Sequence, residues 1–548
     1  MLPRFSSLPR CARNRPSGGH VRVAIYALCS AALCLCLAAA LAGCSTRSEP
    51  YGGEVVLSTF GEPAGFNPLL YTDTLSPNIG SLLFNTLVNI NEQLEYVPEL
   101  AESWRVSEDG LSWEFNLRKD VSFHDGEPLD SGDVLFTYRS VLDPEGDSPL
   151  ASFYAIVESI EAAGSHTVRF RLRKPYSAFP YLMLLEIVPE HLLAGGTSGE
   201  DFARNPVGTG PFAFEKWERE RVVLAANPEY FEGRPYLDRV IVQWFADQSR
   251  AWSALMQGET DTVMDLELED YRVIENDPRF TVYDYTEVFY HTLLFNLRDP
   301  LLSDPRLRLA LDLAVDRRDL IEQALNGRAV ETTGPFRPGT WPYDPEVPRS
   351  VHDPQRAVRI LRELGWSDTD GDRILEKGQR ELTLSVMVDR GDLLKEAAAR
   401  RLKWQLFQAG VRAEVEALPP QQLFEERLFA GDFQAVLLQF NAGVDPDKFL
   451  TYFWHSENIG SSNLGGYADA EVDRLIEQGR TGTDFEERIR IYRGIHARMA
   501  AERPALFLYV RKIYFVTAAR IQGINAAPEL FYPSIKDWYI DTSQTERR

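Results

Sequence analysis

The sequence predicts an α/β fold, and two sets of observations support this. Between residues 382 and 440, strand-like and helix-like patterns alternate in the order strand, helix, strand, helix, strand, which is typical of a parallel sheet covered by helices. Residues 113–117 and 168–172 alternate apolar and polar side chains, which predicts half-buried strands in an antiparallel sheet. A chain of 548 residues is long enough for two or three such domains.

The α/β unit is predicted element by element. The first strand is 382–388, and the helix after it has apolar residues at helical spacing up to Gly410: Leu394, Ala398, Leu402 and Leu406. A second strand starts at Val411, and a second helix runs from Pro419 and Pro420 to Gly431. Residues 433–440 are apolar on both faces, as a central strand requires.

The segment after this central strand is the predicted edge of a binding site. In a parallel sheet, ligands bind beyond the carboxyl ends of the strands, where loops converge. The segment reads Asn441, Ala442, Gly443, Val444, Asp445, Pro446 and Asp447. Asp445 followed by Pro446 predicts a helix N-cap with proline at the first helical position. Asp445 therefore either only caps this helix or also contacts a ligand.

The N-terminus has the pattern of an exported lipoprotein. Five arginines precede an uncharged stretch from Val23 to Ala42, and Leu41-Ala42-Gly43-Cys44 follows the form of a lipobox. We expect a signal peptide at 1–43, lipidation of Cys44 and a polar tether at 44–53. The alternative is a permanent N-terminal helix. The residue after the lipidated cysteine is Ser45, which does not decide between the inner and the outer membrane leaflet as the final location.

Cysteine usage and charge exclude several classes of function. The five cysteines all lie in or beside the leader, at positions 11, 29, 34, 36 and 44, so the mature chain keeps only the lipidated one. Disulfides and thiolate catalysis are therefore excluded. The formal net charge of −23 repels phosphate backbones and excludes nucleic acid as a partner.

Motifs for catalysis or cofactor binding are absent from the sequence. It has no P-loop, no HExxH pair and no GxSxG elbow, and its histidines are scattered. We therefore expect no enzyme, no cofactor and no metal. The acidic run Asp368 to Asp372, followed by Glu376, resembles a calcium loop, but its glycine stands fourth rather than sixth, which favours a plain acidic turn.

Several long blocks resemble the extracellular solute-binding proteins of the peptide and nickel class. The blocks lie at residues 84–138, which include PELAESW and FHDGEPL, and at 205–212, 227–240, 304–321 and 353–366. The likeness runs from about Val55 to the end of the chain. It implies the two-lobed, type II periplasmic-binding fold of the large peptide-binding class, with an extra inserted domain. Lobe I would take 54–92, 206–299 and 508–548, the inserted domain 93–205, and lobe II 300–507.

The resemblance also implies a function and partners. Such a lipoprotein binds a peptide in the cleft between its lobes, closes about a hinge, and delivers its load to an ABC permease and its ATPase. We expect a monomer, held on the membrane by its lipid and facing the periplasm or the cell exterior. A nickel chelate, an opine or an oligosaccharide is the alternative solute. The other possible functions are those of a ligand sensor and of a surface lipoprotein enzyme.

By family position, the pocket should include three pairs of residues and one loop: Asp73 and Thr74, Phe153 and Tyr154, Phe507 and Tyr509, and Phe440, Asn441, Ala442, Gly443, Val444 and Asp445. Phenylalanine and tyrosine at strand ends are more often core residues than stacking platforms, so a core position is the alternative for these aromatic residues. One departure stands out, because peptide-binding members have an aspartate for the ligand's α-amino group where this chain has Ala442. A buried ammonium needs a counter-ion, so Asp73, Asp445 or Asp447 would have to replace it, or the ligand lacks a free amine. Nickel-type members also lack that aspartate.

Overall fold

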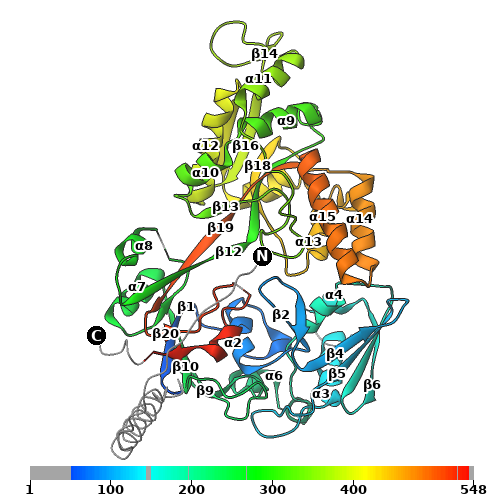
Figure 1. The fold of residues 1–548 in the computed structure, drawn as a ribbon, viewed down its shortest axis with the longest axis vertical. Coiled ribbons are helices and arrows are strands. Elements are labelled where there is room, and N and C mark those ends of the chain that lie inside the picture. The colour runs from blue at the N-terminus through cyan, green and yellow to red at the C-terminus, as the bar shows by residue number, and fades with distance from the viewer. Residues whose placement is uncertain are drawn as a thin grey trace, which may run out of the picture. The chain divides into compact units, whose positions relative to one another are not determined.

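The computed structural model describes residues 51–143, 148, 150–195, 197–266, 268–527 and 529–541. The expected signal peptide at 1–43, Cys44 and the tether up to residue 50 lie outside the described residues. Within the described ranges, helices and strands alternate around several sheets, as expected for an α/β chain (Figure 1). None of the helices there is both long and apolar enough to cross a bilayer.

One sheet has four strands in the order β1-β10-β9-β8. β1 (Glu54–Phe60) is parallel to β10 (Arg239–Phe245), and β9 (Arg221–Ala226) is antiparallel to both β10 and β8 (Phe212–Glu218). The buried side chains of these strands share one apolar cluster with Ile79, Leu82 and Leu83 of α2 (Leu75–Leu83). The neighbouring short elements are η1 (Pro68–Leu70), α5 (Glu190–Leu193), α6 (Gly199–Arg204), α7 (Gln248–Gln257), α8 (Leu268–Ile274), η5 (Pro533–Asp537) and the pair β20 (Ile521–Gln522) and β21 (Tyr539–Ile540).

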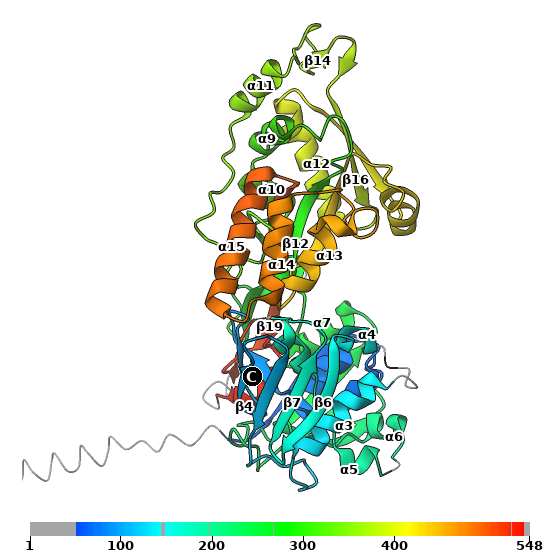
Figure 2. The same cartoon turned by 90° about the vertical axis from the view of Figure 1, so that its right-hand side faces the viewer.

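A second four-stranded sheet is antiparallel throughout, in the order β4-β5-β7-β6 (Figure 2). The two strands expected from alternation are β5 (Ser112–Leu117) and β7 (Thr167–Leu172), and they pair directly, so this prediction is confirmed. β4 (Ala101–Val106) and β6 (Val157–Gly164) flank them, and α3 (Ser131–Leu142) packs on β6 and β7. Phe115, Phe170 and Phe179 meet edge to face or tilted in the core between them.

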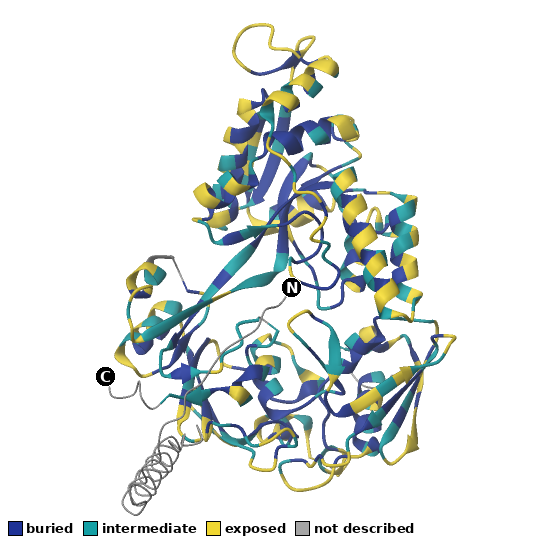
Figure 3. Ribbon diagram, in the orientation of Figure 1, coloured by how far each residue is buried: buried dark blue, intermediate teal, exposed yellow. Residues whose placement is uncertain are grey.

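The largest sheet has the order β11-β19-β12-β18-β16-β17, with β13 (Ala329–Glu331) added to β19. β16 (Thr383–Asp389), β17 (Arg412–Leu418) and β18 (Ala435–Asn441) are mutually parallel, and α12 (Leu393–Gln408) and the π-helical turn η3 (Gln422–Leu428) connect them. The predicted α/β unit is therefore confirmed. Its strands are largely buried while the covering helices are exposed on their outer sides (Figure 3).

The helices around this sheet come from the C-terminal half of the chain. Two apolar clusters fill the two faces of the sheet, one with α12 and one with the pair α14 and α15. The bounds are α9 (Pro305–Ala314), α10 (Arg317–Ala324), α11 (Pro354–Glu363), α13 (Asp447–Trp454), α14 (Ala470–Thr481) and α15 (Phe485–Glu502). The remaining short elements are β2 (Val88–Ile90) with β3 (Tyr96–Pro98), α4 (Ala151–Tyr154), η2 (Phe179–Leu184), β14 (Glu376–Lys377) with β15 (Arg380–Glu381), and η4 (Ser456–Asn458).

Two long strands connect the large sheet with the region around β1. β12 (Phe280–Phe295) and β19 (Ala505–Ala518) run antiparallel, and Figure 1 shows them crossing side by side from one region to the other. Their first pairing block joins 280–286 to 512–518 beside β11 (Thr262–Val263), and the register shifts between Thr286 and Tyr290 before the second block begins. The lobe boundaries given above remain a prediction.

Gly410 shows how tightly α12 meets the next strand. Its φ of +80° suits glycine, and an added Cβ would lie 2.5 Å from Leu375 Cγ. We expect Gly410→Ala to lower the free energy of unfolding by about 1–3 kcal/mol more than the same substitution at a glycine whose added Cβ meets no other atom. Gly258 ends α7 with a similar φ of +73° and has nothing within 4 Å of that position, so Gly258→Ala is the matched control. Urea denaturation of both variants measures the difference, and equal losses would contradict the role of Leu375.

Candidate ligand-binding site

A cavity of about 680 Å³ lies beside α2, within the size range of small-molecule sites. Segments far apart in the sequence line it. They contribute Tyr71, Pro77, Asn78 and Ser81 from α2 and its approach, Asn89, Ile90 and Glu99 from the β2–β3 hairpin, Phe153 and Tyr154 from α4, Tyr181, Leu184 and Glu186 around η2, and Val444, Glu529 and Pro533. The described residues of its lining include three glutamates and neither lysine nor arginine.

Glu186 is the most unusual of these side chains. It follows η2 and is 8% exposed. Tyr71 Oη donates a hydrogen bond to Glu186 Oε2 at 2.8 Å. Burial, reinforced by the charge of Glu99 and opposed by the Tyr71 hydrogen bond, raises the pKa of Glu186 to about 8. Gly80 makes room for the pair, because a Cβ there would lie 2.1 Å from Tyr71 Oη and 3.0 Å from Glu186 Oε1.

Glu99 is buried nearby in a different environment. Its Oε1 accepts hydrogen bonds from the amides of Asn85 and Asn89, both at 3.0 Å. Its Oε2 accepts from the backbone N–H and the hydroxyl of Thr86 at 2.7 and 2.6 Å. Burial raises the pKa of Glu99 although these donors oppose the rise. Glu99 is thus a structural acceptor that fixes the start of the hairpin.

The loop after β18 is held by a buried ion pair. Arg488 of α15 donates to both oxygens of Asp445, from Nη1 to Oδ2 at 2.6 Å and from Nη2 to Oδ1 at 2.7 Å. Tyr96 Oη donates to the same carboxylate at 3.1 Å, and so does the backbone N–H of Asp447 at 3.0 Å. The helix α13 starts at Asp447, with Pro446 as N-cap. The expectation of Asp445 as N-cap and Pro446 as the first helical residue is therefore wrong by one position.

The other two candidate counter-ions are also engaged. Asp73 Oδ1 accepts from the N–H groups of Leu75 and Ser76, and its Oδ2 accepts from the hydroxyl of Ser76, which fixes the start of α2. Burial opposes ionisation, but these hydrogen bonds hold the pKa of Asp73 below its usual value. Asp447 Oδ1 lies 3.3 Å from Arg480 Nε, and burial raises the pKa of Asp447 to about 6 despite that guanidinium.

The other residues predicted for the pocket do not all lie in one place in the structure. Phe153, Tyr154 and Val444 line the cavity, whereas Asp73 and Thr74 do not belong to its described lining. Phe440 and Phe507 are buried against Tyr290 and Trp454, and Tyr509 stacks on His291 at 4.6 Å. Phe507 also lines a separate cavity of about 300 Å³ beside α9. Ala442 donates its N–H to Val288 O, and Asn441 Oδ1 accepts from the N–H of Gly443.

Phe153 connects the cavity rim to the large sheet. It is 42% exposed, and Lys448 Nζ lies 3.6 Å from the centroid of its ring. Burial lowers the pKa of Lys448 from its ordinary value. Because Phe153 belongs to α4 and Lys448 to α13, this cation–π contact joins the region of the antiparallel sheet to the helices after β18.

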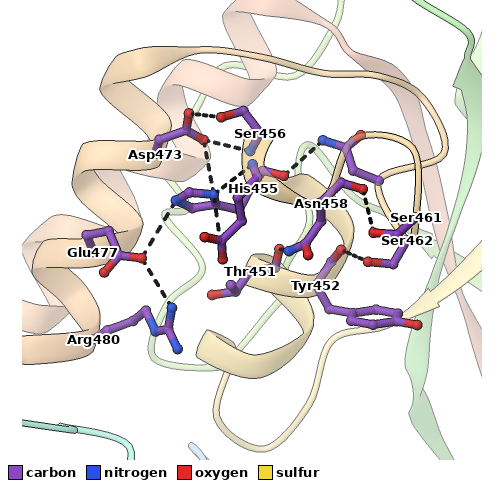
Figure 4. Close-up of polar contacts among 12 residues, drawn as sticks. Thr451, Tyr452, His455, Ser456, Asn458, Ser461, Ser462, Asp473, Glu477 and Arg480 are labelled. Atoms are coloured by element: carbon purple, nitrogen blue, oxygen red, sulfur yellow. Dashed lines mark hydrogen bonds and ion pairs between the residues drawn. The ribbon is translucent and has the colours of Figure 1, made fainter. Parts of the chain in front are cut away.

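Figure 4 shows a polar cluster around His455, where α13 meets α14. The backbone N–H of Glu457 donates to His455 Nδ1, which assigns the ring proton to Nε2. Nε2 lies 3.7 Å from Glu477 Oε1, and Asp473 accepts the N–H and the hydroxyl of Ser456. These contacts join the end of α13 to α14, so His455 has a structural role.

The acidic turn after α11 brings four carboxylates together. The oxygens of Asp368, Asp370, Asp372 and Glu376 lie within 4.8 Å of one another, near enough to hold one cation. Backbone N–H groups of the same turn already donate to them, as Gly371 does to Asp368 and Thr369 to Glu376. Such hydrogen bonds also occur in an acidic turn that binds no ion. The prediction of a plain acidic turn, rather than a calcium loop, is therefore kept.

Sequence reasoning missed the acidic lining of the cavity. The signal for Glu186 is a single charge in the apolar run from Tyr181 to Val188. Tyr71 and Glu529 have no such signal, because only the folded chain brings them to the same cavity.

Known proteins resemble this chain over most of its length. The oligopeptide-binding protein AppA of Bacillus subtilis is 29% identical over 510 residues, covering 90% of this chain and 93% of the relative. Its structure in complex with a nonapeptide matches with a TM-score of 0.64 and 28% identity, over 90% of this chain and 99% of that one. NikZ from Campylobacter jejuni in complex with Ni(L-His) matches with a TM-score of 0.67 and 25% identity, over 90% and 99% of the two chains.

The fold is therefore that of the type II periplasmic binding proteins. A family model for bacterial extracellular solute-binding proteins, family 5, matches residues 95–461, more than half of the chain. The chain belongs to this family of bacterial extracellular solute-binding proteins. Family 5 proteins are non-enzymatic components of transport systems.

Proposed function

We propose that this chain is the substrate-binding lipoprotein of an ABC-type importer and that it captures peptides. The observation that carries the proposal is the cavity of about 680 Å³. It is lined by residues that precede α3, by residues around η2 and by Val444, which belongs to the region of the large sheet. The similarity to a protein whose structure contains a nonapeptide supports a peptide as the guest. Cys44 would carry the lipid, and an ABC permease with its ATPase would receive the load.

Capture would proceed by closure about β12 and β19. These are the two long strands that run between the regions, and their register shift near Thr286 offers a place to bend. A guest that touches Val444 on one side and Asn78 or Ser81 on the other would stabilise the closed state.

A chelated nickel ion is the second candidate guest. The similarity to NikZ with bound Ni(L-His) supports it. So does Ala442, which stands where the resemblance to peptide-binding members implies an aspartate.

Ser81→Trp tests capture directly, because a large side chain at this position would fill the cavity. We expect it to weaken peptide binding by about tenfold or more, corresponding to a loss of about 1.4 kcal/mol or more. Ser253→Trp on α7 is the matched control, since both hydroxyls donate to a carbonyl of their own helix at 2.8 Å and Ser253 lies outside the cavity. Calorimetric titration with a pool of short peptides and with Ni(L-His) measures the effect.

Solution scattering gives the second readout for the full-length protein. We expect the radius of gyration to fall when the preferred guest is added to wild type or to Ser253→Trp. Equal binding by wild type and Ser81→Trp would contradict the site. If Ni(L-His) binds more tightly than every peptide, the guest of this protein is a nickel complex and not a peptide.

A further inference from the structure

Glu186 is poorly satisfied for a buried carboxylate. Among the described residues, the carboxylate accepts one hydrogen bond, from Tyr71, whereas Glu99 nearby accepts four. An ionised carboxylate offers four lone-pair sites, so most of the acceptor capacity that Glu186 has in its ionised form is unused. Because Glu186 also lines the cavity, a donor on a guest can reach it there.

The surroundings of Glu186 favour a cation over an anion. The titratable groups that line the same cavity are Tyr71, Tyr154, Tyr181, Glu99 and Glu529, and all of them are neutral or acidic. Glu529 is paired with Arg337 at 2.8 Å, and Lys448 is engaged with the ring of Phe153. The aromatic faces of Phe84, Phe153, Tyr154 and Tyr181 also suit a cation.

We propose that Glu186 is the counter-ion for an ammonium group of the guest. The ammonium would come from the α-amino group or from a lysine side chain of a peptide. This inference rests on the proposed capture of peptides in the same cavity.

Proton release accompanies this recognition. In the empty cavity, burial raises the pKa of Glu186 to about 8, so the carboxyl is protonated at neutral pH. An ammonium favours the ionised form, so its arrival transfers the proton of Glu186 to solvent and leaves a carboxylate paired with the cation. Affinity for an amine should therefore rise by about tenfold per pH unit below pH 8 and become level near that pH.

The test compares Glu186→Gln with wild type by calorimetric titration at pH 6, 7 and 8. The probes are Ala-Ala-Ala, its N-acetylated form, and N-acetyl-Ala-Lys-Ala. We expect Glu186→Gln to weaken binding of the amine that the site uses by about 10- to 100-fold at pH 8, to leave the acetylated tripeptide unaffected, and to abolish the pH dependence. A loss confined to Ala-Ala-Ala identifies the α-amino group, and a loss confined to the lysine probe identifies the side chain.

Glu190→Gln is the matched control. Glu190 is exposed and lies four residues further along the chain, so Glu190→Gln makes the same chemical replacement outside the cavity lining. Glutamine retains the acceptor for Tyr71, and unchanged melting temperatures check that both variants fold.

Two outcomes separate this inference from peptide capture. If wild type binds all three probes with equal affinity at every pH, the role of Glu186 is overturned while peptide capture stands. If wild type binds none of them, peptide capture fails, and n-butylammonium chloride decides the role of Glu186. It should then raise the melting temperature of wild type but not of Glu186→Gln, and equal shifts would overturn the inference.

Discussion

Replacing Arg488 by methionine will lower the free energy of unfolding by about 3–5 kcal/mol. The guanidinium is buried and pairs with both oxygens of Asp445, which is buried as well. Without Arg488, the hydrogen bonds that the described residues still donate to the Asp445 carboxylate come from Tyr96 and from the N–H of Asp447. Urea denaturation followed by tryptophan fluorescence measures the loss.

Arg474→Met is the control for this change. Arg474 pairs with Glu471 on α14, where both side chains are exposed, so its replacement should cost less than about 1 kcal/mol. Adding Asp445→Asn to Arg488→Met should recover part of the loss, because it removes the unpaired charge. Similar small effects of Arg488→Met and Arg474→Met would contradict the structural role of the buried pair.

Trp454→Ala should be comparably destabilising, at about 3–5 kcal/mol. Trp454 is 1% exposed, its Nε1 donates to Tyr290 Oη at 3.0 Å, and its ring contacts Phe440 and Phe507. Its removal leaves a cavity among these aromatic rings and an unpaired hydroxyl on Tyr290. Thermal and urea denaturation of the variant give the change in stability.

The same substitution at Trp404 provides the comparison. Trp404 of α12 is 50% exposed and has Arg401 over its ring, so Trp404→Ala should cost about 1 kcal/mol or less. A loss at Trp454 as small as that at Trp404 would show that the aromatic cluster does not support the fold.

Local signals predicted the parallel unit well. The spacing of Leu402 and Leu406, the stop at Gly410 and the apolar run at 433–440 all act over a few residues, and the structure has the expected elements at these places. The partners of β12 and β19 could not be predicted in this way. These strands pair across more than 200 residues, and the shift near Thr286 depends on both strands together.

The site was predictable only in part, for a similar reason. Phe153, Tyr154 and Val444 were placed by resemblance and do line the cavity. Phe440 was also placed by resemblance, but a resemblance does not show which face of a strand its side chain occupies, and in the structure its ring packs against Trp454. Nothing in the neighbourhood of Asp445 indicates that Arg488, 43 positions away, occupies its carboxylate.

The pairing of distant strands also constrains the order in which the newly made chain assembles. β1 ends at Phe60, yet its partner is complete only at Phe245, and β12 must wait for β19, which ends at Ala518. Almost half of the polypeptide must therefore be synthesised before the first of these ladders closes, and nearly all of it before the second closes. Such a topology favours slow maturation and leaves early segments exposed to association with other molecules in the meantime.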